Sequence, residues 1–472
     1  MRIDKLQTRR LLLALVLAFV PGCILRHTTT DQPQVATAKT SNVEWIAGTA
    51  SVVITPDGPI WMGGYAQRFQ PSQAVSQDLY AKVLAVQDED GERLVLVTID
   101  LLGITEAMRS EVERQAKQQY GLEPSDLLMN ASHTHSGPEV RIESLRIEKQ
   151  EIKWIERAEQ YVQETSRKIV SAIGEALDRL VPARLSFTHV RCGFAKNRRS
   201  MRHTGRRDKL NPDGPVDQDV PVLRVDSIEN GPLRAIVFGY ACHNNVLSGY
   251  DLNGDYAGWA QSILQAARPE MLALFMAGCG GDQNPYPLGT ADLAKQHGQS
   301  LADSVDAALM AQGKPLRGPL RTAIETVRLP FAKGPTRAQL REAAKSKKIR
   351  DRRYAQRLLR QLDENSGFIQ EYDYPVQVAR FGNDLTLIGL AGEPVVDYSL
   401  RLKRELAGSA VWVAGYCNAL PTYIPSLRVL REGGYEAGGH RRYTNFAAPF
   451  DESIEERIVG KVHELYQRLG GN

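Results

Sequence analysis

Cysteine is scarce in this chain of 472 residues. Only five cysteines are present, and no two of them have the CxxC spacing typical of a cysteine-bound structural zinc. Four of them lie in the body of the chain: Cys192, Cys242, Cys279 and Cys417. An oxidising compartment would permit these four to pair, although the sequence leaves their connectivity open.

A strong excess of charge is also absent. The formal net charge is +4, and residues 1–22 carry four basic groups and one acidic group, so the rest of the chain is close to neutral. This balance gives no indication of a nucleic-acid partner. Nothing in the composition indicates an oligomeric state.

The N-terminal region has the pattern of a secretory signal. Basic residues precede an apolar run, Leu11–Val20, which is well short of the roughly 20 residues that cross a bilayer as a helix. Val20-Pro21-Gly22-Cys23 then resembles a bacterial lipobox, in which Cys23 is acylated; ordinary cleavage beside a chance cysteine is the alternative. We predict a signal peptide over 1–22 and a lipid-anchored flexible tether over 23–43. The protein is then exported, periplasmic or at the cell surface, and held to the membrane surface through Cys23.

Short apolar runs alternate with amphipathic helical patterns along the rest of the chain. The runs predict buried strands at 93–99, 127–130, 233–240, 272–276, 385–390 and 411–414. Apolar positions three and four apart predict helices over 105–120, 153–179, 256–267, 291–311, 395–406 and 453–469. We predict a mixed α/β fold, with central β-sheet layers flanked by helices and an active site in loops at strand ends.

Residues 335–364 form a strongly basic helical stretch. A stretch of this kind is most often a solvated helix or helical hairpin, which is the interpretation that we favour. Contact with anionic lipid headgroups is the alternative.

Three predicted strands end in residues that bind zinc in proteins. His133 and His135 follow the run 127–130 at positions i and i+2, so both imidazoles point to the same face if the strand continues. His243 closes a second strand and Glu393 follows a third. Two histidines and one carboxylate form a common catalytic zinc shell, in which the metal lowers the pKa of bound water to about 7. Taken singly, each histidine could instead be a hydrogen-bonded structural residue, and Glu393 a neighbour of a helix N-cap.

The order of these segments resembles the neutral/alkaline non-lysosomal ceramidase family, enzymes that hydrolyse the amide of N-acylsphingosine. The segments that carry the resemblance are Ser132-His133-Thr134-His135-Ser136-Gly137-Pro138, Asn197-Arg198, Ala241-Cys242-His243, Gly281-Asp282-Gln283-Asn284-Pro285, Gly392-Glu393-Pro394, Asn418, Tyr423-Ile424-Pro425 and Tyr435-Glu436. The resemblance implies a ceramidase-like catalytic domain over residues 44–472 and a lipid substrate.

The resemblance also implies a zinc ion held by His133, His243 and Glu393. The tyrosine ligand of the family falls on Thr422, a poor substitute for a phenolate, so we expect three protein ligands and more solvent at the metal. His135 is expected beside the metal as a proton shuttle, because imidazole titrates near neutral pH, or else as a fourth ligand.

Arg198, Tyr423 and Tyr435 match family residues and are expected to donate hydrogen bonds to a developing oxyanion. The sharpest departure is Asn284, which stands where the family has its nucleophilic serine. Because an amide cannot be activated as an alkoxide, either metal-activated water attacks while Asn284 orients the substrate, or the reaction differs from ceramide hydrolysis. Asp282 is expected either to support the site or to cap the following turn.

We therefore predict an exported, zinc-dependent amidohydrolase that cleaves the amide of a ceramide-like N-acyl lipid or a related acyl bond. We expect the C-terminal immunoglobulin-like domain of larger members to be absent, because no further β-rich segment follows. The missing serine and tyrosine ligand motivate an alternative, a catalytically silent lipid- or glycan-binding protein on the same scaffold. The retained histidines and Glu393 argue against a pure binder.

Overall fold

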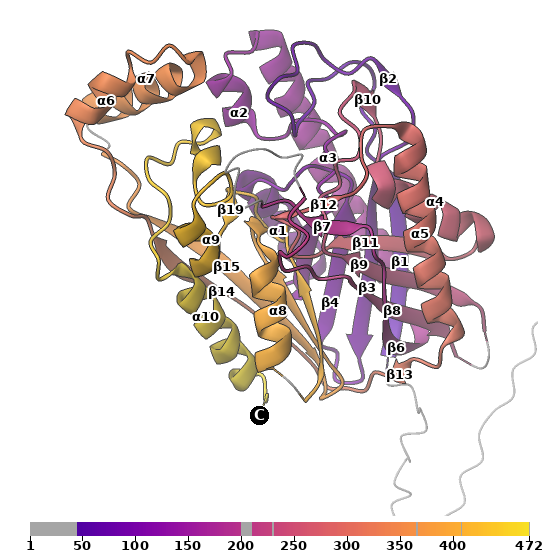
Figure 1. Cartoon of the computed structure of the whole chain (residues 1–472). Helices are drawn as coiled ribbons and strands as arrows, with labels where there is room; N and C mark the ends of the chain where they lie inside the picture. The colour runs from indigo at the N-terminus through magenta and orange to yellow at the C-terminus, as the bar shows by residue number, and fades with distance from the viewer. Residues whose placement is uncertain (1–44, 200–209, 229–230, 365–366, 407, 472) are drawn as a thin grey trace, which may run out of the picture. The chain divides into compact units, whose positions relative to one another are not determined.

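The computed structural model describes residues 45–199, 210–228, 231–364, 367–406 and 408–471 (Figure 1). The predicted signal peptide, Cys23 and the tether over 23–43 lie outside these residues and stay predictions. Contacts within the chain group Val43–Asn472 into a single unit. No helix in the described ranges combines the length and hydropathy of a membrane span.

The larger of the two main sheets has nine strands, in the order β11-β9-β8-β6-β1-β3-β4-β5, with β13 against β6. Their bounds are β1 Trp45–Val53, β3 Tyr80–Asp88, β4 Arg93–Ile99, β5 Leu127–Ala131, β6 Val181–Arg191, β8 Asp219–Ser227, β9 Leu233–Tyr240, β11 Leu272–Ala277 and β13 Lys314–Pro315. The pairs β4–β5 and β9–β11 are parallel and the pairs between them are antiparallel. Each parallel pair is joined by a helix, as a parallel connection requires.

Helices cover one face of this sheet. They are α1 Glu106–Tyr120, α3 Ile152–Asp178, α4 Asp255–Ala267 and α5 Ala291–Met310. Strands β3 and β4 supply apolar side chains to both faces, because successive residues of a strand point in opposite directions. Val83 and Val95 pack with the helices, whereas Leu84 and Leu94 pack against the second sheet.

The second main sheet contains β14 Leu320–Pro330, β15 Glu371–Phe381, β16 Leu385–Leu390 and β18 Ala410–Ala414. Its inner face contributes Phe381 and Leu387 to the core shared with the larger sheet. Its outer face packs against α8, Val396–Glu405, and α10, Ile454–Arg468. The unit is thus built of four layers, helices, sheet, sheet and helices, and the predicted α/β class is confirmed (Figure 1).

Shorter elements lie around the ends of the sheets. They are α2 Ile142–Ile147, α6 Arg337–Ala343, α7 Ile349–Asp363, α9 Leu427–Glu432, η1 Pro124–Asp126, η2 Gly439–Tyr443, and the paired short strands β2 Ala74–Val75 with β10 Asp251–Leu252, β7 Ala195–Asn197 with β12 Gln283–Pro285, and β17 Glu393–Pro394 with β19 Tyr423–Ile424. The basic stretch over 335–364 is thus a helical hairpin, α6 and α7. The four cysteines that an oxidising compartment would permit to pair are all free and buried.

Candidate metal centre

The ends of strands from both sheets bring the predicted ligands together. His133 follows β5 and His243 follows β9 in the larger sheet, whereas Glu393 follows β16 in the second sheet. An isolated bridge between Thr134 and Asn244 joins the loops that carry His133 and His243. A second bridge joins Asn130, in β5, to Cys417, in the segment after β18. Because the two sheets pack face to face, loops that are far apart in sequence meet at one end of the layers.

The backbone at His133 differs from the sequence-based expectation. Strand β5 ends at Ala131, and His133 has a φ of +59°, so the strand does not continue through the His-Thr-His segment. The two imidazoles nevertheless meet, with 3.3 Å between Nε2 of His133 and Nε2 of His135. Hydrogen bonds from this segment to the loop after β9 hold the turn, including His135 N to Asn244 O at 3.0 Å.

The hydrogen bonds of His133 and His243 determine which ring nitrogens carry protons. Nδ1 of His133 lies 2.6 Å from the carbonyl oxygen of Leu102, and Nδ1 of His243 lies 2.7 Å from that of Gly280. A carbonyl only accepts, so each Nδ1 donates, and each neutral ring presents an Nε2 lone pair. Burial lowers the pKa of His243 to about 3, so this ring is neutral at physiological pH.

Glu393 completes a cluster of electron-pair donors. Its Oε2 lies 3.3 Å from Nε2 of His133 and 3.3 Å from Nε2 of His243. This oxygen is buried and has no hydrogen-bond donor among the residues that the structure describes. Two imidazole nitrogens and a carboxylate oxygen are ligand types that zinc binds, and their spacing fits ligand bonds of roughly 2 Å.

His135 belongs to the same cluster. Ligand atoms of His133, His135 and His243 all lie within 4.8 Å of one another, and these three buried histidines could hold a metal ion. The histidine rings are close, with ring centroids 5.6 Å apart for His135 and His243. The structure therefore leaves open both roles considered for His135, proton shuttle and additional ligand.

Tyr423 reaches the cluster from the short strand β19. Its hydroxyl lies 3.2 Å from Nε2 of His243, and β19 places Tyr423 opposite Glu393 in the β17–β19 pair. Thr422 instead contacts Nε2 of His440 through its hydroxyl. The hydroxyl beside His243 thus belongs to Tyr423 and not to Thr422. The expectation of three protein ligands at the metal stays a prediction.

Arg198 lies behind Tyr423 and makes three contacts with protein groups. It donates from Nη2 to the Tyr423 hydroxyl at 3.0 Å, from Nε to Glu436 at 2.9 Å, and from Nη1 to Asn284 Oδ1 at 3.1 Å. Although burial disfavours its charge, Tyr423 and Glu436 raise the pKa of Arg198 well above its ordinary value.

Asn284 and Asp282 have separate structural partners. Asn284 lies on β12 and presents its Oδ1 to Arg198. Asp282 accepts from the backbone of Val396 at 2.9 Å and from Asn197 at 3.1 Å. Asp282 therefore supports the start of α8 and the segment that carries Arg198, rather than the turn that follows it.

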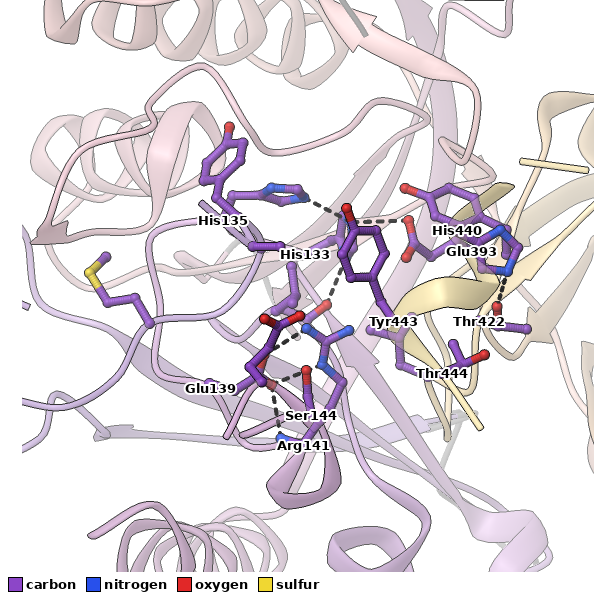
Figure 2. A pocket seen from close by; sticks show the side chains of 18 of the residues that line it. His133, His135, Glu139, Arg141, Ser144, Glu393, Thr422, His440, Tyr443 and Thr444 are labelled. Carbon is purple, nitrogen blue, oxygen red and sulfur yellow. Dashed lines mark hydrogen bonds and ion pairs between the residues drawn. The ribbon is translucent and has the colours of Figure 1, made fainter. Parts of the chain in front are cut away.

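A cavity of about 110 Å³ opens onto the cluster (Figure 2). Of the predicted site residues, those that line it are His133, His135, Glu393, Tyr423 and Tyr435. One part of the wall is apolar, with Trp61, Met62, Leu102, Leu145 and Leu420. Another part is polar and includes residues that sequence reasoning missed: Glu139, Arg141, Ser144, His440 and Tyr443. Glu139 and Arg141 form an ion pair at 2.6 Å. Their charge within six residues of His135 in the sequence is the signal that could have found them.

Comparisons with known proteins identify the family of this chain and its fold. The family model described as neutral/alkaline non-lysosomal ceramidase, N-terminal, matches residues 47–319. The match covers more than half of the chain, and the chain belongs to this family.

Two curated relatives match at low identity. Neutral ceramidase A of Dictyostelium discoideum is 25% identical over 267 residues, which cover 51% of this chain and 36% of the relative. The neutral ceramidase of Mycobacterium tuberculosis is 24% identical over 460 residues, covering 80% of this chain and 70% of the relative. The chain thus matches about a third of the first relative's length and 70% of the second's.

Two solved structures share the fold. The neutral ceramidase from Pseudomonas aeruginosa has a TM-score of 0.67 at 19% identity, and the match covers 89% of this chain and 75% of that one. A ceramidase complexed with C2 has a TM-score of 0.68 at 17% identity, covering 91% and 76%. At these identities the likeness shows the fold.

Proposed function

We propose that the protein hydrolyses the amide bond of ceramide-like N-acyl lipids, with a zinc ion held by His133, His243, Glu393 and Tyr423. The observation that carries the proposal is the convergence of Nε2 of both histidines on Oε2 of Glu393, at 3.3 Å each, without a donor for that oxygen among the described residues. Membership of the ceramidase family supports the reaction class.

The side chains around the cluster have separate roles in this proposal. An ion bound there lowers the pKa of water and polarises a substrate carbonyl. His135 lines the cavity beside His133 and moves the proton between the attacking water and the leaving amine. Tyr435 donates to the developing oxyanion, and Arg198 keeps the Tyr423 hydroxyl in place. Because Asn284 cannot form an alkoxide, water is the nucleophile.

The cavity walls suit an amphipathic substrate. Trp61 and Leu145 offer an apolar surface for the acyl chain, and Arg141, Ser144 and Tyr443 offer hydrogen-bonding groups for a polar portion. We further propose that the protein is exported and anchored through Cys23, which would bring the cavity to lipid substrates. The pattern of residues 1–23 supports this localisation.

The test combines metal analysis with turnover. The purified full chain is assayed for bound zinc, and then for hydrolysis of short-chain ceramide, aryl amides and esters, with and without a chelator. We expect one zinc-dependent activity, strongest on the ceramide. His133→Ala and Glu393→Gln should each remove the metal and the activity. If both variants kept full metal content and turnover, the zinc assignment would be wrong, and bound zinc without any turnover would support the silent binder instead.

Two tyrosine variants separate metal binding from oxyanion stabilisation. Tyr423→Phe removes the hydroxyl beside His243 and should lower zinc affinity by roughly tenfold or more. Tyr435→Phe should keep the zinc but lower kcat by about 10²-fold to 10³-fold, the usual cost of one oxyanion donor. Equal zinc affinity in both variants would contradict the role of Tyr423 as a ligand.

A further inference from the structure

The helical hairpin of α6 and α7 is an addition to the fold rather than part of its layers. It connects β14 to β15, which pair with each other along their whole length from Leu320 to Pro330. A small cluster holds it, in which Leu340 and Leu358 pack with Ala447. Figure 1 shows the hairpin apart from both sheets, on the same side as α2. The hairpin adds little to the packing of the sheets, so packing does not explain which residues it contains.

The hairpin is strongly cationic. Between residues 336 and 364 it has ten basic and four acidic side chains. The basic residues are Arg337, Arg341, Lys345, Lys347, Lys348, Arg350, Arg352, Arg353, Arg357 and Arg360. Two of them are paired with acids of the hairpin itself, Arg337 with Asp363 and Lys345 with Glu342. Lys347, Lys348 and Arg353 are exposed and have no carboxylate partner in the described part of the chain.

The start of α7 contacts residues that line the cavity. Arg350 donates to the carbonyl oxygen of Ala66 at 3.2 Å and to the hydroxyl of Tyr443 at 3.2 Å. Ala66 and Tyr443 both line the cavity that contains His133 and Glu393. Lys348 and Lys347, two and three residues before Arg350, therefore adjoin in sequence a residue that contacts two groups of the cavity lining.

Two large apolar side chains close to these contacts in sequence are exposed. Ile349, between Lys348 and Arg350, is 50% exposed, and Phe69, three residues after Ala66, is 78% exposed. Isolated exposed apolar residues are ordinary on protein surfaces. Here Ile349 adjoins Arg350 and Phe69 is three residues from Ala66, so exposed cations and exposed apolar groups lie near the two ends of one contact in sequence.

We propose that a rim formed by Lys347, Lys348, Ile349 and Phe69 docks on the surface of an anionic lipid bilayer. Cationic side chains are attracted to anionic headgroups, and apolar side chains next to them enter the boundary between headgroups and acyl chains. Nucleic acid would also bind the lysines, but it offers no apolar environment for Ile349 and Phe69, which a bilayer does. Docking holds the mouth of the cavity against the bilayer, so an N-acyl lipid enters without crossing water; this consequence rests on the proposed function, whereas the docking does not.

Vesicle binding tests the docking surface directly. The full chain carrying Cys23→Ser, which prevents acylation at that residue, is sedimented with vesicles of phosphatidylcholine alone or mixed with phosphatidylglycerol. We expect binding to the anionic vesicles only, weakening as salt is added. Lys347→Glu/Lys348→Glu should lower the partition coefficient about tenfold or more. Ile349→Ser should lower it without a change of charge.

A matched charge reversal serves as the control. Arg184, on β6, and Arg317, just after β13, are exposed. Figure 1 shows the labels of β6 and β13 at the opposite end of the drawn unit from α6 and α7. Arg184→Glu/Arg317→Glu should bind the anionic vesicles like the parent. Docking at the rim is refuted if both double variants lose binding equally, or if the Lys347/Lys348 variant binds as the parent does.

Kinetics separate this inference from the proposed function. With a soluble short-chain ceramide, Lys347→Glu/Lys348→Glu should turn over like the parent, because neither lysine lines the cavity. With ceramide embedded in anionic vesicles its rate should fall in parallel with its binding. If the parent cleaves neither substrate, the proposed function fails, and the vesicle partition alone decides the docking.

Discussion

Gly64 lies against the imidazole of His135 and has a φ of +92°. A methyl group at this position would come within 2.7 Å of Cγ and Nδ1 of the ring. We therefore expect Gly64→Ala to displace His135 and to lower kcat by about 10²-fold or more, the usual contribution of a positioned acid–base group. The measurement is turnover of short-chain ceramide by protein with full zinc content.

Gly58 offers a control, because its backbone also has a positive φ. Its φ is +101°, and an added Cβ would meet nothing within 4 Å. Gly58→Ala should lower the free energy of unfolding by about 1 kcal/mol, through strain alone, and leave kcat unchanged. If both variants lost turnover equally, the contact with His135 would not be the cause.

The residues of the site differ in how well the sequence predicts them. His133, His243 and Glu393 follow strand-like runs, and that position made them recognisable. Tyr423 was expected to donate to an oxyanion, and no local pattern indicated that its hydroxyl also lies 3.2 Å from Nε2 of His243. The two neighbouring side chains point to different partners. The hydroxyl of Thr422 contacts His440, and the hydroxyl of Tyr423 contacts His243.

At the scale of elements, α4 begins with a buried carboxylate. Asp255 accepts hydrogen bonds from the backbone of Leu247 at 2.9 Å and of Tyr256 at 2.7 Å. Burial outweighs these bonds and raises the pKa of Asp255 from 3.8 to about 6. The folded chain therefore holds this proton more tightly than the unfolded chain does.

The sign of the resulting pH dependence follows from linkage. The stabilising contribution of the Asp255 proton is complete below about pH 4 and is lost as the pH rises through about 6. Relative to Asp255→Asn, which does not titrate, the parent should lose about 3 kcal/mol of unfolding free energy across this window. Urea unfolding of both proteins at several pH values measures the difference. Parallel profiles would contradict the raised pKa.

The elements themselves were largely readable from local patterns. The helix expected over 105–120 begins after Thr105, whose hydroxyl accepts from Met108 N and caps α1. The basic stretch over 335–364 was interpreted as a solvated helix or a helical hairpin, and the structure has the hairpin, α6 and α7. Its place beside the cavity depends on contacts of Arg350 with Ala66 and Tyr443. Those contacts join residues more than 90 positions apart in the chain.

At the scale of the whole molecule, the cluster joins both sheets, so a bound ion should stabilise the entire unit. Zinc at 1,000 times its Kd should raise the free energy of unfolding by about 4 kcal/mol, provided that the unfolded chain does not bind it. Thermal unfolding with zinc and with a chelator measures this effect. His133→Ala should abolish the shift, whereas His189→Ala, at an exposed position on β6, should retain it. No shift with zinc in the parent would contradict the metal centre.

The sequence by itself determined the α/β class, the strands with their branched apolar runs, the helices with their amphipathic faces, and the family. These features follow from local periodicity and short motifs, which the chain carries without reference to its fold. Only the tertiary structure decided that Tyr423 reaches His243, that Arg198 supports it from behind, and that the cationic hairpin borders the cavity. Each of these depends on how two sheets pack face to face, and that packing sets distances between residues hundreds of positions apart, which no local pattern records.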